Sequence, residues 1–384
     1  MLKRINLSVI LFFVSSFFAC GQSDPGFDFK GYLKHMNIIS VFNADSLTTS
    51  SLFHNRLKFK WYSANDFSAA LEIRNRMFYG EQIKLSPLLG KVLNQDNGLF
   101  DMAFLLTDQK GCKLVTNIDR AYLRWNKDNI DVQLGRQRIN WGISLVWNPN
   151  DLFNAASFVD FDYEERSGTD ALRIQYKTAS LSGFEFIASP GKEAKKSIYA
   201  LMYRFNKHKY DVQLFSAVYL SDIALGLGWA GSLKQLGFKG ELTCFKSYEK
   251  ALFPKQAINS SISFDYTFKG SNYFNLSYLY NSNGSNTLGQ PGNINSLYVN
   301  DVKHLSPALH SAFFQISRAF NPLITGSFST IFLVGMNQFF LMPSINYSIK
   351  DDWDINLVVQ SLLNNPDKKE NNLTNLFLRL RWSF

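Results

Sequence analysis

Apolar and polar residues alternate one by one along most of this chain, and this period of two limits the fold more than any other feature. In the final segment, apolar side chains at 376, 378, 380, 382 and 384 fall on one face, whereas Arg379, Arg381 and Ser383 fall on the other. Successive side chains of a β-strand point to opposite faces, whereas a helix repeats every 3.6 residues. The same alternation runs through 53–61, 118–125 and 171–176. The sequence therefore predicts an all-β protein.

Composition removes several other classes of protein. The chain has 384 residues, of which 15% are aromatic and 18% charged, and disordered chains lack aromatic residues. Three cysteines are too few for a disulfide-stapled miniprotein. Beyond the N-terminus, no run reaches the roughly 18 uncharged apolar residues of a spanning helix. The net charge of +9 does not indicate nucleic-acid binding, because the basic residues alternate with apolar ones along the strands.

Residues 1–21 have the layout of an export signal. Basic residues at 3 and 4 precede an uncharged apolar stretch that runs to Ala19, and a small-residue cleavage pattern ends at Gly21. We expect one domain, 22–384, beginning near Gln22. The alternative is a lipidated Cys20, which the two phenylalanines before Ala19 disfavour. In either case the protein is expected to leave the cytoplasm.

Alternating segments are joined by connections that themselves alternate between short and long. A membrane-spanning barrel has short turns at its periplasmic rim and long loops outside, whereas a soluble sandwich has no reason to sort its loops in this way. Aromatic residues gather at segment ends, as at a membrane interface. We predict a transmembrane antiparallel up-and-down β-barrel of about 18 strands, with 16 as the alternative. The expected strands are 27–41, 50–62, 66–78, 117–126, 129–138, 168–177, 180–188, 196–206, 209–219, 222–232, 235–246, 257–268, 271–281, 306–318, 322–333, 337–349, 352–363 and 373–384.

The chain ends on an amphipathic strand with the aromatic residues Trp382 and Phe384. This ending resembles the C-terminal signal by which outer-membrane barrels of Gram-negative bacteria are recognised for assembly. The resemblance implies the barrel assembly machinery and outer-membrane lipid as partners, and the Gram-negative outer membrane as the location. Oligomerisation is open, since no interface pattern can be read from the sequence.

Basic residues dominate one face of the early strands, and closure of a barrel places the last strand beside them. Charges facing lipid are costly, whereas charges facing water tune the selectivity of a pore. We therefore predict a pore-lining basic wall, interrupted mainly by Asp28, Glu72 and Asp131. Its members are Lys30, Lys34, Arg56, Lys58, Lys60, Arg74, Arg76, Arg120, Arg124, Arg173, Arg379 and Arg381.

The third outward loop, 139–167, carries the opposite charge and many apolar residues. Exposure of so many apolar side chains to water is unfavourable, so we expect the loop to fold into the lumen as a constriction; the alternative is a cap on the rim. The residues expected to form the constriction are Trp141, Asp151, Asp160, Asp162, Glu164 and Glu165.

Other motifs favour no enzyme and no cofactor. A G-x-G-x-x-G pattern at 226–231 lies within an alternating strand, not between a strand and a helix as a dinucleotide site requires. Its small inward face leaves room for an infolded loop. The five histidines show no metal-ligand spacing. Cys112, placed in a long loop, and Cys244, on a strand, leave a bridge open without requiring one.

Three short motifs resemble a signature of porin-like outer-membrane proteins. They are G-R-Q-x-x-x-W-G from Gly135, N-P-x-D from Asn148, and R-x-G-x-D-A-L-R from Arg166. The resemblance covers about forty residues and implies an outer-membrane channel. We therefore expect passive diffusion of small polar or anionic solutes between basic wall and acidic loop. The alternative is a barrel that exports or binds an acidic surface polysaccharide.

Overall fold

The computed structural model describes residues 26–42, 46–96, 98–155, 157–162, 166–248, 256–286, 301–364 and 372–384. The expected export signal lies outside these ranges. Nineteen strands are present in the described residues: β1 (Gly26–Phe42), β2 (Ser46–Tyr62), β3 (Phe67–Gly80), β4 (Ala103–Gln109), β5 (Cys112–Lys127), β6 (Ile130–Gln137), β7 (Thr169–Ala179), β8 (Ser182–Ser189), β9 (Ile198–Lys207), β10 (Tyr210–Tyr219), β11 (Asp222–Leu233), β12 (Leu236–Ser247), β13 (Gln256–Phe268), β14 (Asn272–Asn281), β15 (His310–Asn321), β16 (Ile324–Val334), β17 (Gln338–Lys350), β18 (Trp353–Asn364) and β19 (Leu373–Ser383).

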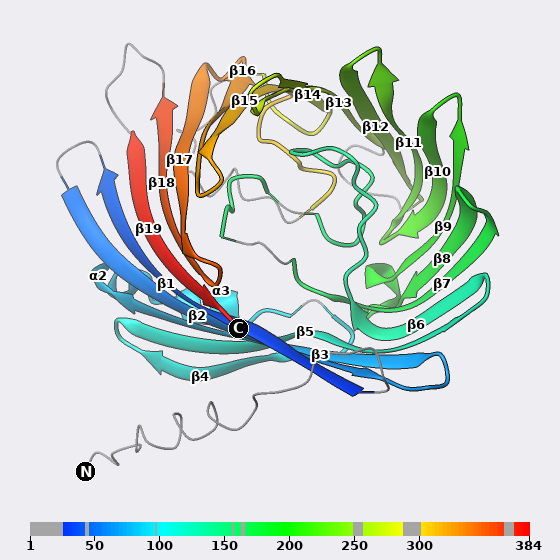
Figure 1. The fold of residues 1–384 in the computed structure, drawn as a ribbon, viewed down its shortest axis with the longest axis horizontal. Coiled ribbons are helices and arrows are strands. Elements are labelled where there is room, and N and C mark those ends of the chain that lie inside the picture. The colour runs from blue at the N-terminus through cyan, green and yellow to red at the C-terminus, as the bar shows by residue number, and fades with distance from the viewer. Residues whose placement is uncertain are drawn as a thin grey trace.

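Eighteen of these strands close into one antiparallel barrel (Figure 1). Each pairs with its neighbours in the chain, and β1 closes the ring by pairing with both β2 and β19. The remaining strand, β4, pairs only with the upper part of β5. The predicted 18-stranded barrel is therefore confirmed. Backbone bonds between Gly31 and Phe384 join the two ends of the barrel sheet at the rim of tight turns.

Alternation sorts the side chains between lumen and exterior. On β2, Leu52, His54 and Arg56 are buried toward the lumen, whereas Phe53 and Phe59 are exposed on the outside. Exposed aromatic residues gather outside near the tight turns, as in the interfacial belt of a membrane barrel. This belt includes Phe27, Trp61, Phe67, Tyr176, Phe184, Phe268, Phe320, Trp353 and Phe384. No helix in the described part of the chain is long and apolar enough to cross a membrane.

The connection after β3 is more structured than the sequence suggested. It contains the short helices α2 (Glu81–Lys84) and α3 (Leu89–Leu93), followed by β4. Strand β5 begins at Cys112, so the placement of this cysteine in a loop was wrong. The reason is that 103–127 forms a β-hairpin, in which β4 occupies the edge of β5 above the short strand β6.

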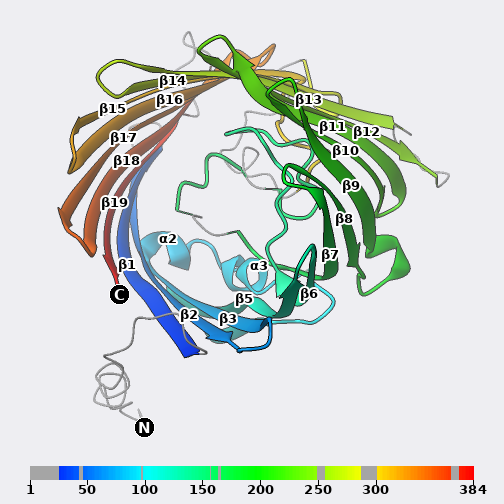
Figure 2. The same ribbon diagram turned by 45° about the vertical axis from the view of Figure 1, so that its right-hand side comes forward.

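The apolar core of this barrel lies inside it, where two segments enter the lumen (Figure 2). The connection 138–168 supplies Ile139, Trp141, Val146, Trp147, Leu152 and Val159, and the segment 301–309 supplies Val302, Leu305 and Ala308. They pack against lumen-facing apolar side chains of β7–β19 and of the upper ends of β1 and β2. The basic residues of β1–β5 face the rest of the lumen.

Candidate functional site: the lumen and its infolded loop

The 138–168 connection, here called the lumen loop, is first attached to β12 by one carboxylate. Glu241 is fully buried in the wall. Its Oε1 accepts the backbone N–H groups of Ile143 and Ser144 at 2.6 and 2.9 Å, and its Oε2 accepts that of Asn150 at 2.9 Å. A carboxylate can accept several backbone N–H groups at once, because each of its two oxygens has two lone pairs. Glu241 therefore fixes the course of the chain just before the N-P-x-D turn and within it.

Small residues on the neighbouring strand make room for this attachment. Asn150 donates from Nδ2 to the carbonyl of Leu227 on β11 at 3.1 Å. A Cβ on Gly228 would lie 2.7 Å from Asn150 Nδ2 and 2.7 Å from Ile143 Cδ1. A side chain at Gly228 would therefore push the lumen loop away from the wall. The G-x-G-x-x-G pattern lies within β11, and its small inward face receives the loop as expected.

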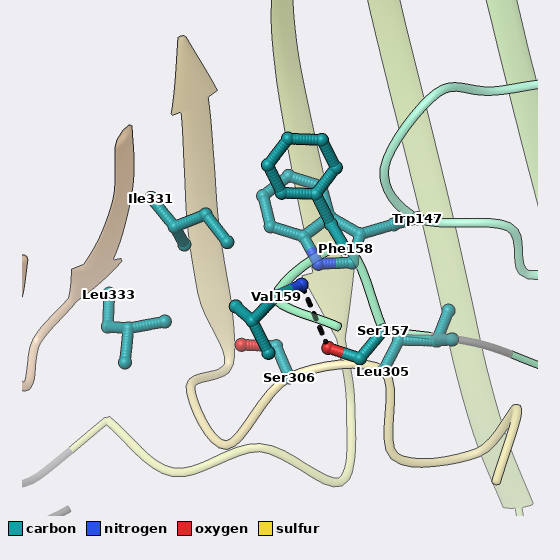
Figure 3. Close-up of a pocket in the computed structure, with 8 residues that line it drawn as sticks. All are labelled: Trp147, Ser157, Phe158, Val159, Leu305, Ser306, Ile331 and Leu333. Carbon is teal, nitrogen blue, oxygen red and sulfur yellow. Dashed lines mark hydrogen bonds between the residues drawn. The ribbon is translucent and has the colours of Figure 1, made fainter. Parts of the chain in front are cut away.

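The middle of the lumen loop is held mainly by apolar packing (Figure 3). Trp147 and Phe158 pack edge-on against Phe313 of β15, with ring centroids 6.4 and 4.8 Å away. Gln360 of β18 donates to the carbonyl of Val159 at 2.6 Å. The cavity left among Trp147, Val159 and their neighbours is about 10 Å³, which is room for about one water molecule. The contact is thus a packed junction and not a ligand pocket.

The far end of the loop is held by charge. Asp162 Oδ1 lies 2.9 Å from Lys34 Nζ of β1 and 2.9 Å from Arg379 Nη1 of β19, while Oδ2 faces His54 of β2 at 3.5 Å. Burial opposes ionisation here, but the hydrogen bond with His54 and the charges of Lys34 and Arg379 outweigh it and lower the pKa of Asp162. This carboxylate therefore stays ionised and pins the loop where the last strand meets the first.

Asp160 faces the same wall but differs from Asp162 in its ionisation. Burial and the neighbouring charge of Asp162 raise the pKa of Asp160 to about 6, although Arg76, Arg74 and Lys34 act in the opposite direction. The charge that the loop presents to the wall therefore changes near neutral pH. Two of the predicted constriction acids, Asp160 and Asp162, thus lie opposite basic residues.

The wall contains an acid that strict alternation hides. A register shift in the pairing of β3 with β5 turns both Asp119 and Arg120 toward the lumen. Asp119 bonds to Arg56 at 2.6 Å and to Arg74 at 3.0 Å, and Arg56 also bonds to Glu72 at 2.7 Å. The basic wall is therefore a bonded network with a net positive charge. Counting from Ala121 would place Asp119 outside, because a β-bulge breaks the period of two.

The other predicted wall residues lie on the lumen side of their strands, with individual partners. Arg120 donates to the backbone carbonyl of Arg166 at 2.7 Å, which ties the wall to the end of the lumen loop. The described partners of the rest are Asn117 for Arg76, Asp131 for Arg124, Glu185 for Arg173, and the Tyr32 ring for Arg381. Lys30, Lys58 and Lys60 continue the wall on β1 and β2 toward the tight turns, with Lys30 bonded to Asp28.

Two predicted constriction residues do not face the wall. Trp141, 2% exposed, packs on the opposite side of the lumen and donates from Nε1 to Glu185 at 3.1 Å. Asp151 is buried and bonds to Arg166 of its own loop at 2.5 Å. Both residues shape the loop because apolar and internal contacts outweigh attraction to the wall. Glu164 and Glu165 lie outside the described residues.

Sequence reasoning missed the residues that hold these segments. Glu241 and Glu185 are single acids in alternating strands, and the only available signal was their inward position. The resemblance motif contained Arg136, which bonds to Asp170 and to Asp96 of the segment after α3 at 2.7 and 2.5 Å. It therefore anchors the β3–β5 connection above the short strands. Burial acts to raise the pKa of Asp96, but the hydrogen bond with Arg136 outweighs it and lowers that pKa.

The described residues hold no group of histidine, cysteine and acidic side chains that could bind a metal. Cys112 and Cys244 are free and lie on β5 and β12, so no bridge joins them. A cavity of about 440 Å³ lies below the lumen loop beside Trp141, Arg204 and Gln213. Because Leu181, in the turn between β7 and β8, also lines it, this space belongs to the lumen on the tight-turn side.

The fold is that of known outer-membrane channels. The structure of OccAB4 from Acinetobacter baumannii matches with a TM-score of 0.59 and 10% identity, over 93% of this chain and 98% of the other. OpdQ from Pseudomonas aeruginosa matches with a TM-score of 0.59 and 8% identity, over 93% of this chain and 98% of the other. The outer membrane protein OprD from Pseudomonas aeruginosa matches with a TM-score of 0.59 and 10% identity, over 93% of each chain. At these identities the likeness establishes the architecture.

No family model matches the sequence. No curated protein matches it either.

Proposed function

We propose that this protein is a channel of the Gram-negative outer membrane through which small polar or anionic solutes diffuse passively. The observation that carries the proposal is the asymmetry of the lumen. One side, on β1–β5, presents a net positive network of basic residues, and the lumen loop presents Asp160 and Asp162 toward it. On β7–β19 the infolded segments cover much of the lumen face by apolar packing.

The arrangement supplies a transverse electric field where the lumen loop meets the basic wall. Positive side chains on one side and carboxylates on the other orient dipolar solutes as they pass. Cations outnumber acids on the wall, and several acids are already bonded to arginines. The remaining positive potential attracts anions and slows cations. Passage needs no chemistry, so we propose no catalytic residue and no cofactor.

The similarity to channel structures supports this proposal, because OprD and OccAB4 share the fold over nearly the whole chain. The outer apolar face with its aromatic belt fits a bilayer on the outside of the same barrel. The terminal aromatic residues suit recognition by the barrel assembly machinery: Phe384 packs near Phe29, with ring centroids 5.8 Å apart, and Trp382 packs on Trp353.

The decisive experiment is a planar-bilayer recording of the purified, folded barrel with a salt gradient. Discrete conductance steps and a reversal potential on the anion side would support the proposal. Strong cation selectivity would contradict the anion preference. A verified folded barrel that passes no current would favour a conduit for an acidic polysaccharide. Binding of a polyuronate would then be measured by calorimetry, with neutral dextran as the control.

A further inference from the structure

A row of hydrogen-bonded polar side chains crosses the outer face of the barrel on β2, β3 and β5. Thr116 Oγ1 donates to Asn75 Oδ1 at 2.7 Å, Asn75 Nδ2 donates to Asn55 Oδ1 at 3.2 Å, and Asn55 Nδ2 donates to the carbonyl of Tyr32 at 3.2 Å. The pairing places Asn55 opposite Asn75, and Asn75 opposite Thr116. We call Asn55, Asn75 and Thr116 the outer amide row. It lies on the face that carries Phe53 and Phe59, opposite to His54 and Arg56.

The outer amide row lies at the depth of the bilayer interior. Trp61, in the aromatic belt, and Asn55 are six residues apart on β2. Six residues span roughly 20 Å along a strand, or about 15 Å along the membrane normal at a tilt of about 40°. The apolar band of such a barrel is about 25 Å tall. The row is therefore near the middle of the band, with apolar residues such as Leu57 and Phe53 below and above it.

The described contacts within the barrel leave some hydrogen-bond donors of the outer amide row unused. Each asparagine nitrogen carries two hydrogens, and the described contacts use one from Asn55 and one from Asn75. Four residues before Asn55 on β2, Ser51 donates to Asn37 Oδ1 at 2.8 Å on the same outer face. Lipid chains offer no acceptor for the remaining hydrogens. At the same depth, the outer positions of β13–β19 in the described residues carry mainly leucine, isoleucine, valine and aromatic side chains.

We propose that the outer amide row of β1–β5 is the contact surface between copies of this chain in the membrane. A partner at this depth must span the bilayer and offer donors and acceptors at the same height. A second copy does so necessarily, because all copies enter the membrane in one orientation and an axis along the membrane normal preserves height. Asparagine both donates and accepts, so two identical rows complement each other, and polar side chains join membrane segments in this way. The inference depends on the membrane location but not on conduction.

Photocrosslinking in the outer membrane tests the contact. The photoreactive residue p-benzoylphenylalanine replaces Phe53, which is 36% exposed beside the row, or Phe328, which is 38% exposed on β16 as the matched control. We expect the variant at 53 to give a covalent adduct of twice the protomer mass, mapped by mass spectrometry to β1–β5 of a second copy. The variant at 328 should give lipid adducts only. Lipid adducts alone from 53, or an adduct with a different protein, would overturn the proposal.

A second measurement removes the row itself. The double variant Asn55→Leu, Asn75→Leu should run as single copies in native mass spectrometry under conditions where the wild type retains its partners, and Thr330→Leu on β16 serves as the control. Folding is checked by the heat-dependent shift in gel mobility. An oligomer that survives the double substitution would refute the role of the row. If the double variant fails to fold, the photocrosslink decides alone. A silent but oligomeric barrel would contradict conduction and leave this contact standing.

Discussion

Replacing Glu241 with alanine should release the lumen loop from the wall. The change removes the acceptor of the Ile143, Ser144 and Asn150 amides. A hydrogen bond contributes about 1 kcal/mol to stability, so the three together contribute roughly 3 kcal/mol. Since about 1.4 kcal/mol is a factor of ten in an equilibrium, the released form should become about a hundredfold more populated.

Hydrogen exchange measures this release directly. The three amides should lose about two orders of magnitude of protection from exchange, while amides in the middle of β12 keep theirs. Single-channel currents should become larger and noisier, because the loop no longer narrows the lumen permanently. Glu241→Gln should show protection between that of the wild type and that of Glu241→Ala. It keeps an oxygen for the amides of Ile143 and Ser144 but turns an NH₂ group toward the Asn150 amide.

The matched control is Asp265→Ala. Asp265 is a lumen carboxylate on the adjacent strand β13, and its described ion pair is with Lys239 of β12 at 3.1 Å. This variant should leave both the protection and the current noise unchanged. Wild-type protection of the three amides in Glu241→Ala would refute the reasoning. So would equal loss of protection in the Asp265 control.

Four further outcomes follow from the geometry. Replacing Arg120 and Arg124 with alanine should shift the reversal potential toward cations while the heat-modifiable barrel persists; unchanged potentials would count against their lining the pore. Because burial and Asp162 raise the pKa of Asp160 to about 6, this carboxyl loses its charge as the pH falls from 8 to 5. Anion preference should rise over that range in the wild type and stay flat in Asp160→Asn, and equal slopes would argue against this assignment. Gly228→Val should displace the loop and raise conductance, since the added atoms overlap the side chains of Asn150 and Ile143; an unaltered current would refute this displacement. Phe384→Ala should reduce the amount of folded barrel in the outer membrane without changing the refolding of purified protein, and normal assembly in cells would refute the assembly role.

The local regularity of the sequence determined the barrel. The period of two assigns every side chain of a strand to lumen or exterior once a single residue is placed, so the 18 strands and the inward basic residues could be predicted. The alternation of short and long connections then predicted the two rims, and the acidic charge of 139–167 favoured a position of this loop inside the lumen. Even the glycines at 226 and 228 were interpretable, because a strand with a small inward face must face something close.

Only the tertiary structure decided how the lumen is arranged. Alternation fails at a bulge, so the sequence did not predict that Asp119 faces the lumen. It also did not predict the hairpin that contains Cys112. Partners such as Glu241 for Asn150, or Arg379 for Asp162, are distant in sequence, and closure of the ring sets their distance. The outer amide row likewise arises from register, since Asn55, Asn75 and Thr116 align only when β2, β3 and β5 pair. Side-chain periodicity is a property of one strand, whereas pairing, pinning and exposure are properties of the closed barrel.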